Sequence, residues 1–305
     1  MIMFMRSILL AAGLLAGLPA LAQLGGVIKA GVITEARGNV AGQTGKGKPQ
    51  LLKKGQQIRP GMVIDSLAGS DTVLAFPDGQ IGVLGSKGTV RLNNYAYDPK
   101  DPSKNDINLN LVEGNLRVVM GEIAQSNPAA LHLQVGTASV ALQSSSKDSP
   151  ADASLVSHDG AIAVSVQEGR LEVRLPNGSV LRVSAGQTLM LSQDGNPQVL
   201  PTAQAMQVLG DSPLGQQIQA QLAESRGFSQ IISETQKTIA AVTDSLKNST
   251  AAPDSPEAKL ILAALEELPA AAQVAADLPP PEFNTAITPA TGAAGGGTPC
   301  TASCN

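Results

Sequence analysis

Aromatic side chains are scarce in this chain of 305 residues, which has four Phe, two Tyr and no Trp. Charged residues make up only 15% of it, and the formal net charge is −4. Proteins that bind nucleic acids need Lys and Arg to contact phosphates and usually aromatic rings to stack on bases. The composition therefore argues against a nucleic-acid partner.

Cysteine and histidine, the residues that most often hold metal ions, occur only twice each. Cys300 and Cys304 lie close together near the end of the chain, where they could close a small disulfide ring but could not staple a distant core. His132 and His158 have no obvious third ligand near them in the sequence. We therefore expect no metal site and no cofactor.

The sequence also lacks a recognisable catalytic motif. Ser157, His158 and Asp159 are the residue types of a catalytic triad, but they are consecutive. Neighbours on a strand point to opposite faces of the sheet, so a nucleophile and a base placed in this way cannot reach each other. We expect a protein that is not an enzyme.

One long apolar run is present, at the N-terminus. Arg6 precedes the run Ile8–Leu18, and Ala20-Leu21-Ala22 has the small-x-small pattern of a cleavage site. This predicts a signal peptide over residues 1–22 and a periplasmic or secreted protein; an uncleaved anchor is the alternative. The most apolar later stretch, Ala258–Leu268, is shorter than the roughly 20 residues of a spanning helix, so no membrane span is expected after cleavage.

Short β-branched runs separated by turn residues dominate the stretch from Gly55 to Leu92. Asp71–Phe76 alternates apolar and polar residues, as half-buried strands do, and Asp78-Gly79 is a strong hairpin signal. Similar runs continue at even spacing to about Leu191. This spacing predicts a mainly β fold, either a multi-stranded sandwich or roll or a solenoid-like domain, over residues 23–200.

Two predicted strand pairs share a short repeated sequence. Glu113-Gly114-Asn115-Leu116-Arg117-Val118 resembles Glu168-Gly169-Arg170-Leu171-Glu172-Val173. In both places the Glu-Gly pair is predicted to be a turn, between strands Ile107–Val112 and Asn115–Met120 in the first case.

The order of these turn and strand residues resembles a known family. The pattern Gly55-x-x-Ile58-x-x-Gly61-x-x-Ile64, then Phe76-x-Asp78-Gly79-x-Ile81, then Gly88-Thr89-Val90-Arg91-Leu92 is similar to the FecR-like domain of bacterial envelope proteins. The resemblance extends from about Gly31 to about Leu191. It implies a periplasmic protein–protein interaction module that senses or relays the state of an envelope protein partner.

Regulators of this family also have a cytoplasmic domain and a membrane helix, and we expect neither in this chain. Candidate partner or ligand contacts are Phe76, Asp78 and Gly79 in the hairpin and Tyr95 and Tyr97 in the loop that follows. The alternative function is a cell-wall glycan or peptidoglycan-binding module that stacks sugars on these aromatic rings. An edge strand that accepts a strand of another protein would suit the first function.

Helical patterns replace strand patterns after about residue 200, and we expect an α-helical segment over residues 201–268. Ser212-Pro213 is a typical helix start. The helix Phe228–Leu246 has apolar residues at alternating steps of four and three, which would suit a homodimer or packing on its own β domain. Residues 269–305 are rich in Ala, Pro, Gly and Thr and are predicted to be a flexible low-complexity tail.

The signal-peptide pattern makes a direct prediction about the mature protein. We expect the exported chain to begin at or near Gln23, because signal peptidase cleaves after small residues such as Ala22. Mass spectrometry of the protein purified from an envelope fraction measures this. An intact N-terminus at Met1 or Met3 would contradict it.

Overall fold

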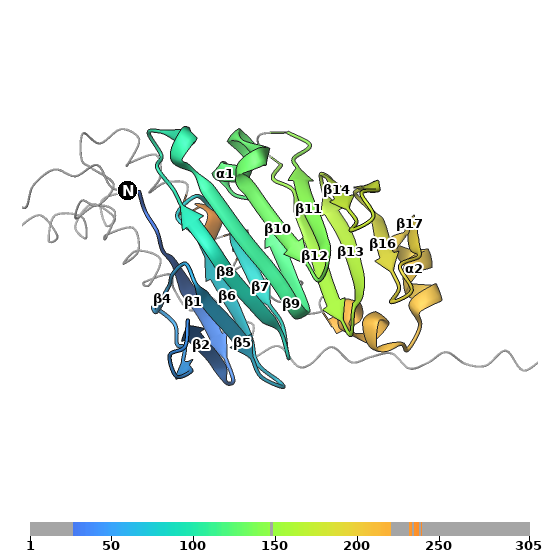
Figure 1. Cartoon of the computed structure of the whole chain (residues 1–305), viewed down its shortest axis with the longest axis horizontal. Coiled ribbons are helices and arrows are strands. Elements are labelled where there is room, and N and C mark those ends of the chain that lie inside the picture. Colours follow the sequence, from blue (N-terminus) through green and yellow to red (C-terminus); the bar gives the residue numbers. More distant parts are fainter. Residues whose placement is uncertain (1–26, 147–148, 221–231, 234, 238, 240–305) are drawn as a thin grey trace, which may run out of the picture.

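Two facing β-sheets that share one long strand make up the fold (Figure 1). This computed structural model describes residues 27–146, 149–220, 232–233, 235–237 and 239. The predicted mainly β fold is confirmed: in the described part of the chain, 17 strands are divided between the two sheets and the helices are short.

The first sheet contains nine strands, one of which is the second half of the shared strand β9. In spatial order they are β4 (Gln57–Ile58), β1 (Gly31–Arg37), β6 (Asp71–Ala75), β7 (Ile81–Leu84), β9 (Asp106–Val119), β12 (Asp152–His158), β13 (Ala161–Glu168), β16 (Gln187–Leu191) and β17 (Pro197–Pro201). All neighbours in this sheet are antiparallel.

The second sheet also contains nine strands and includes the first half of β9. In spatial order they are β3 (Gln50–Leu51), β2 (Val40–Thr44), β5 (Met62–Ser66), β8 (Thr89–Ala96), β9, β10 (Leu131–Val135), β11 (Ala138–Gln143), β14 (Arg170–Arg174) and β15 (Val180–Ser184). The pair β9–β10 is parallel and the others are antiparallel.

Successive hairpins along the chain join the two sheets in alternation. The hairpin β6–β7 joins the first sheet, β10–β11 the second, β12–β13 the first, β14–β15 the second and β16–β17 the first. Each hairpin extends its sheet in the same direction, which gives the row of strands along the long axis of the molecule (Figure 1). Of the predicted alternatives, this arrangement of two facing sheets corresponds to the multi-stranded sandwich.

Strand β9 corrects one prediction. Instead of a turn at Glu113-Gly114, the structure has one strand of 14 residues. The partner of Thr89 is Glu113 and that of Val90 is Leu111, so Val112 is the extra residue of a β-bulge. The bulge bends β9 out of the second sheet and into the first, where its later residues pair with β7 and β12.

The second Glu-Gly pair has the same role. Gly169 lies between β13 in the first sheet and β14 in the second. Both Gly114 and Gly169 have positive φ, +86° and +81°, which glycine adopts without steric cost. The repeated sequence thus marks places where the chain changes sheets.

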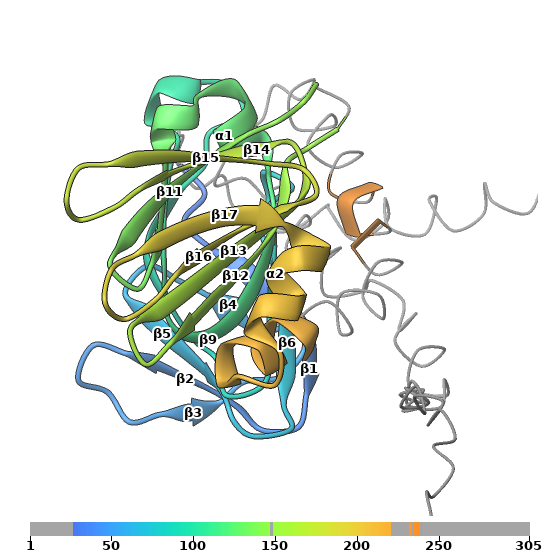
Figure 2. The ribbon, with the colours of Figure 1, turned by 90° about the vertical axis from the view of Figure 1, so that its right-hand side faces the viewer.

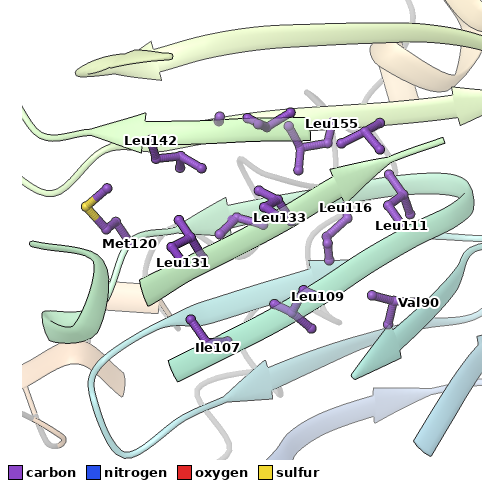
Figure 3. Close-up of a cluster of buried hydrophobic side chains, with 14 of the residues drawn as sticks. Val90, Ile107, Leu109, Leu111, Leu116, Met120, Leu131, Leu133, Leu142 and Leu155 are labelled. Carbon is purple, nitrogen blue, oxygen red and sulfur yellow. The ribbon is translucent and has the colours of Figure 1, made fainter. Parts of the chain in front are cut away.

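The core lies between the sheets and contains side chains from both. Figure 3 shows Leu116 and Leu155 from the first sheet facing Leu109 and Leu133 from the second. Each of these four side chains is at most 2% exposed. Burying a Leu of this kind stabilises the fold by about 1.5–3 kcal/mol.

Helices cover the outer face of the first sheet. α2 (Thr202–Leu209) lies within the segment predicted to be helical, next to β16 and β17 (Figure 2). A helix over residues 213–220 follows, and its Leu214 and Ile218 pack on Val156 and Ala163. Its predicted start is confirmed, because the N–H of Gly215 donates to the Ser212 hydroxyl at 3.1 Å.

The described residues of the helix Phe228–Leu246 also pack on this sheet. Ile232 joins a cluster with Val73, Ile81, Val83 and Val119. Thr235 and Ile239 are buried as well. Ile232 and Ile239 of the apolar stripe therefore contact their own β domain, as one of the two interpretations of this helix expected.

Several predicted features lie outside the described residues. They are the signal peptide, Phe228 and Leu246, residues 240–268 of the predicted α-helical segment, the tail, and the pair Cys300 and Cys304. No helix in the described part of the chain combines the length and the hydropathy that a membrane crossing requires.

The bulge in β9 predicts a large loss of stability on Gly114→Ala. A Cβ there would lie 2.5 Å from Gly88 Cα and 2.8 Å from the Lys87 carbonyl oxygen, in addition to the positive φ. We expect a loss of about 3 kcal/mol or more in the free energy of unfolding, measured by urea denaturation.

Gly178→Ala is the matched control, because Gly178 has a φ of +84° but no atom within 4 Å of its Cβ position. It should lose only about 1 kcal/mol. Equal losses for the two variants would show that the close contact at the bulge does not matter.

Candidate functional site

The five predicted contact residues are brought together, but in the interior. Phe76, Tyr95 and Tyr97 have no exposed area, and Asp78 is 4% exposed. The rings of Phe76 and Tyr95 are 4.9 Å apart between centroids. Only Gly79 is not fully enclosed. The expectation of an exposed contact surface here needs correction, because rings without exposed area cannot touch a partner or stack on a sugar.

Asp78 is the centre of this buried network. The Tyr95 hydroxyl donates to one carboxylate oxygen at 3.2 Å, and the N–H of Ile123 lies 3.4 Å from the other. The N–H of Glu122 donates to the Asp78 carbonyl at 2.7 Å. Asp78 thereby caps the start of α1 (Glu122–Ser126), whose own N-cap residue, Gly121, has no side chain. The network joins the β6–β7 hairpin to β8 and α1.

Burial has a clear electrostatic effect on this carboxyl group. Loss of solvation raises the pKa of Asp78 from 3.8 to about 6, although the N–H groups and the Tyr95 hydroxyl oppose this by stabilising the charged form. Loss of solvation and the neighbouring Asp78 also hold the pKa of Tyr95 well above its usual value. The charged form of Asp78 is therefore a cost to the folded state at neutral pH.

The outer face of the second sheet is polar, in contrast to the helix-covered face of the first. His132, Gln134, Ser139 and Arg174 are exposed on β10, β11 and β14. They border a groove of about 250 Å³, whose other lining residues include Glu172 and Val180. This groove leads to β15, the last strand of the sheet.

Four strands lie at sheet edges, and three of them are poorly suited to accept another strand. β3 and β4 have two residues each, and β17 has Pro197 and Pro201 at its two ends. β15 has five residues and no proline, and its one sheet neighbour among the described strands is β14. It is the edge best suited to pairing with another chain.

Hydrogen bonds at both ends of β15 establish which backbone groups are available. The N–H of Ala185 donates to the Gly169 carbonyl at 3.1 Å, and the N–H of Leu175 donates to the Ser179 carbonyl at 2.9 Å. In an antiparallel pair the bonded residues alternate, so those at 181 and 183 face β14. The N–H and C=O groups of Val180 and Arg182 therefore point outward.

Side-chain charge near this edge is mainly positive. Arg170, Arg174 and Arg182 are exposed on β14 and β15. Arg182 lies 3.1 Å from Glu172, and its own side chain is 78% exposed, so this pair contributes little stability. Inward from the same edge, Val183 is buried and Leu181 is half-buried.

The structure places the two histidines far apart in the fold. His132 on β10 lies 3.3 Å from Asp106, whereas His158 at the end of β12 lies 2.7 Å from Glu113. Ser157 does not approach His158, because its hydroxyl donates to the Val112 carbonyl at 3.2 Å. The sequence analysis did not predict that Glu113 and His158 lie next to each other, because they are 45 residues apart in the chain.

Comparisons with known proteins give a distant likeness to solved structures. No protein-family model and no curated protein matches the chain. Two crystal structures of a "putative anti-sigma factor" from Parabacteroides distasonis ATCC 8503 resemble it with 17% and 16% sequence identity and a TM-score of 0.36 in each case. Each likeness covers 48% of this chain, which spans 65% and 64% of the two solved chains.

The buried carboxyl group predicts how stability depends on pH. Because the pKa of Asp78 is higher in the folded state than in the unfolded one, the folded state binds more protons between about pH 4 and 6. The contribution of Asp78 to the free energy of unfolding should therefore be greatest below pH 4. As the pH rises through about 6, the free energy of unfolding should fall by up to about 3 kcal/mol.

Asp78→Asn should remove this pH dependence, and Asp211→Asn, at an exposed position, should keep it. Tyrosine fluorescence can report urea unfolding at each pH, because the chain has no Trp and both tyrosines are buried. The same pH profile in the wild type and in Asp78→Asn would contradict the assignment.

Proposed function

We propose that this protein is a non-catalytic interaction module of the bacterial cell envelope, of the FecR-like type, that binds an extended segment of a protein partner along β15. The observation that supports the proposal most directly is the free edge of β15. Two N–H and two C=O groups, those of Val180 and Arg182, point away from β14. Strand addition to such an edge is a common way of recognising an extended peptide.

The side chains around this edge define the chemistry of the partner. An added strand would place alternate residues beside Leu181 and Val183 on the inner side and beside Val180 and Arg182 on the outer side. The inner positions would favour apolar residues. The outer positions, near Arg174 and Arg182, would favour Asp or Glu. The expected partner segment therefore alternates apolar and acidic residues.

Sensing or signalling in the periplasm is part of this proposal and rests on the sequence resemblance and the signal-peptide pattern. A homodimer through Phe228–Leu246 would have to use surfaces other than Ile232 and Ile239, which are buried against the β domain. The glycan-binding alternative loses its main support, since every aromatic ring in the described part of the chain is buried.

Photo-crosslinking in cells can test the edge directly. A photoreactive residue at Val180 should capture a protein segment that mass spectrometry identifies as alternating apolar and acidic. The same residue at Gln198, which is exposed on the proline-flanked edge β17, should capture at least about tenfold less. Equal capture at the two positions would contradict the proposal.

Arg182→Pro provides a matched test of the backbone. It removes an outward N–H but none of the hydrogen bonds to β14, so the fold should keep its urea midpoint while capture falls at least about tenfold. Arg182→Ala keeps the N–H, so capture should fall only by the part that the positive charge of Arg182 contributes. Sedimentation with peptidoglycan, unaffected by Arg182→Pro and without a captured protein, would instead favour the glycan-binding function.

A further inference from the structure

Three titratable side chains from distant parts of the chain meet where β9 changes sheets. Glu113 precedes the bulge glycine, His158 ends β12, and Asp159 follows it in the turn to β13. One potential ligand atom from each lies within 4.8 Å of the other two. His158 is 28% exposed, so the cluster is sheltered but can be reached from solvent.

The charges in this cluster are not balanced. Glu113 and Asp159 bring two negative charges, and their ion-pair partner among the described residues is His158 for both. Even a protonated imidazole would leave a net charge of −1. A divalent cation with a neutral imidazole would bring the sum to zero, and carboxylate and imidazole groups are common ligands of such ions.

A fourth side chain, that of Gln217, also points to a cation site here. The Gln217 Nε2 lies 3.1 Å from the Nδ1 of His158, which also lies 2.7 Å from a Glu113 oxygen. Nδ1 can either donate to the carboxylate or accept from the amide, but it cannot do both. The Gln217 Oε1 is buried and has no hydrogen-bond partner among the described residues. Rotating the amide by half a turn exchanges the two atoms and directs Oε1 to the cluster.

We propose that Glu113, His158 and Asp159 bind a divalent transition-metal ion of the zinc type, with the Gln217 carbonyl as the fourth ligand. Zinc bonds to imidazole nitrogen and carboxylate oxygen are about 2.0–2.2 Å long, so its ligand atoms lie roughly 3.3–3.5 Å apart. The 2.7 and 3.1 Å separations around Nδ1 need only a small outward movement to reach this. Asp159 lies 3.6 Å from Nε2, the other ring nitrogen of His158; because 78% of its side chain is exposed, it can turn toward an ion on the Nδ1 side.

The ion would connect the helix over residues 213–220 to two strands that already pair with each other in the first sheet. Glu113 belongs to β9, His158 to β12, and Gln217 to the helix over residues 213–220. That helix rests on the first sheet through Leu214 and Ile218. A ligand that binds only the folded state stabilises it, so zinc should raise the thermal midpoint and slow hydrogen exchange in this helix.

Equilibrium dialysis with zinc, followed by metal analysis, tests the proposal. The chain should be free of tags and carry Cys300→Ser and Cys304→Ser, which removes the two thiols as competing ligands. We expect one zinc ion per chain. His158→Ala should weaken binding at least about tenfold, and Gln217→Ala should weaken it less. His132→Ala is the matched control and should bind zinc as before, because His132 pairs with one carboxylate only.

Two results would overturn the site: no zinc bound by the thiol-free chain, or zinc binding that is the same after His158→Ala. Either would show that the cluster is an ordinary ion pair between His158 and Glu113. Far-UV circular dichroism establishes that each variant is folded. If His158→Ala does not fold, Glu113→Gln takes its place, with the same expected loss and the same contrary result.

Discussion

The structure depends on one strand that belongs to two sheets. β9 pairs with β8 and β10 in its first half and with β7 and β12 in its second half. Its residues Leu109 and Leu116 lie in the same core cluster, on opposite sides of the bulge. Because both sheets are built outward from this strand, the bend at Val112 and Gly114 determines how they face each other. Every later hairpin is added to a sheet whose orientation β9 has already set.

The two outer faces of the sandwich have different physical characters. The outer face of the first sheet is apolar at Val73, Val83 and Val156, and helical residues that follow the strands in sequence cover it. The outer face of the second sheet carries exposed polar residues such as His132 and Gln134, and it ends in β15, whose outer edge pairs with no other described strand. Helical residues of the same chain cover the first face. The second face leaves backbone N–H and C=O groups and charged side chains available to a partner.

Prediction from the sequence was accurate where local rules act. Strand positions followed from alternation and turn residues, since each hairpin is a local unit whose glycines fix the turn. The start of the helix at Ser212 was also predictable, because one hydroxyl satisfies a free N–H of the first turn. Residues 197–201 were not predicted as a strand, because proline disfavours strands except at edges, and β17 is an edge.

Predictions of sites were poorer for a physical reason. Phe76 and Asp78 stand out in the sequence, and the sequence alone determined that they lie beside a turn. Tyr95 also stands out, but it was predicted in a loop and lies in β8, paired with Ile107 of β9. Only the tertiary structure decided that all three face inward, because α1 and β8 close over the hairpin that carries Asp78. Glu113, His158 and Gln217 have no sequence pattern in common, since contacts over 45 and 59 residues depend on how hairpins stack. Residue types and turns are properties of short segments; burial, free edges and converging charges depend on the packing of the whole chain.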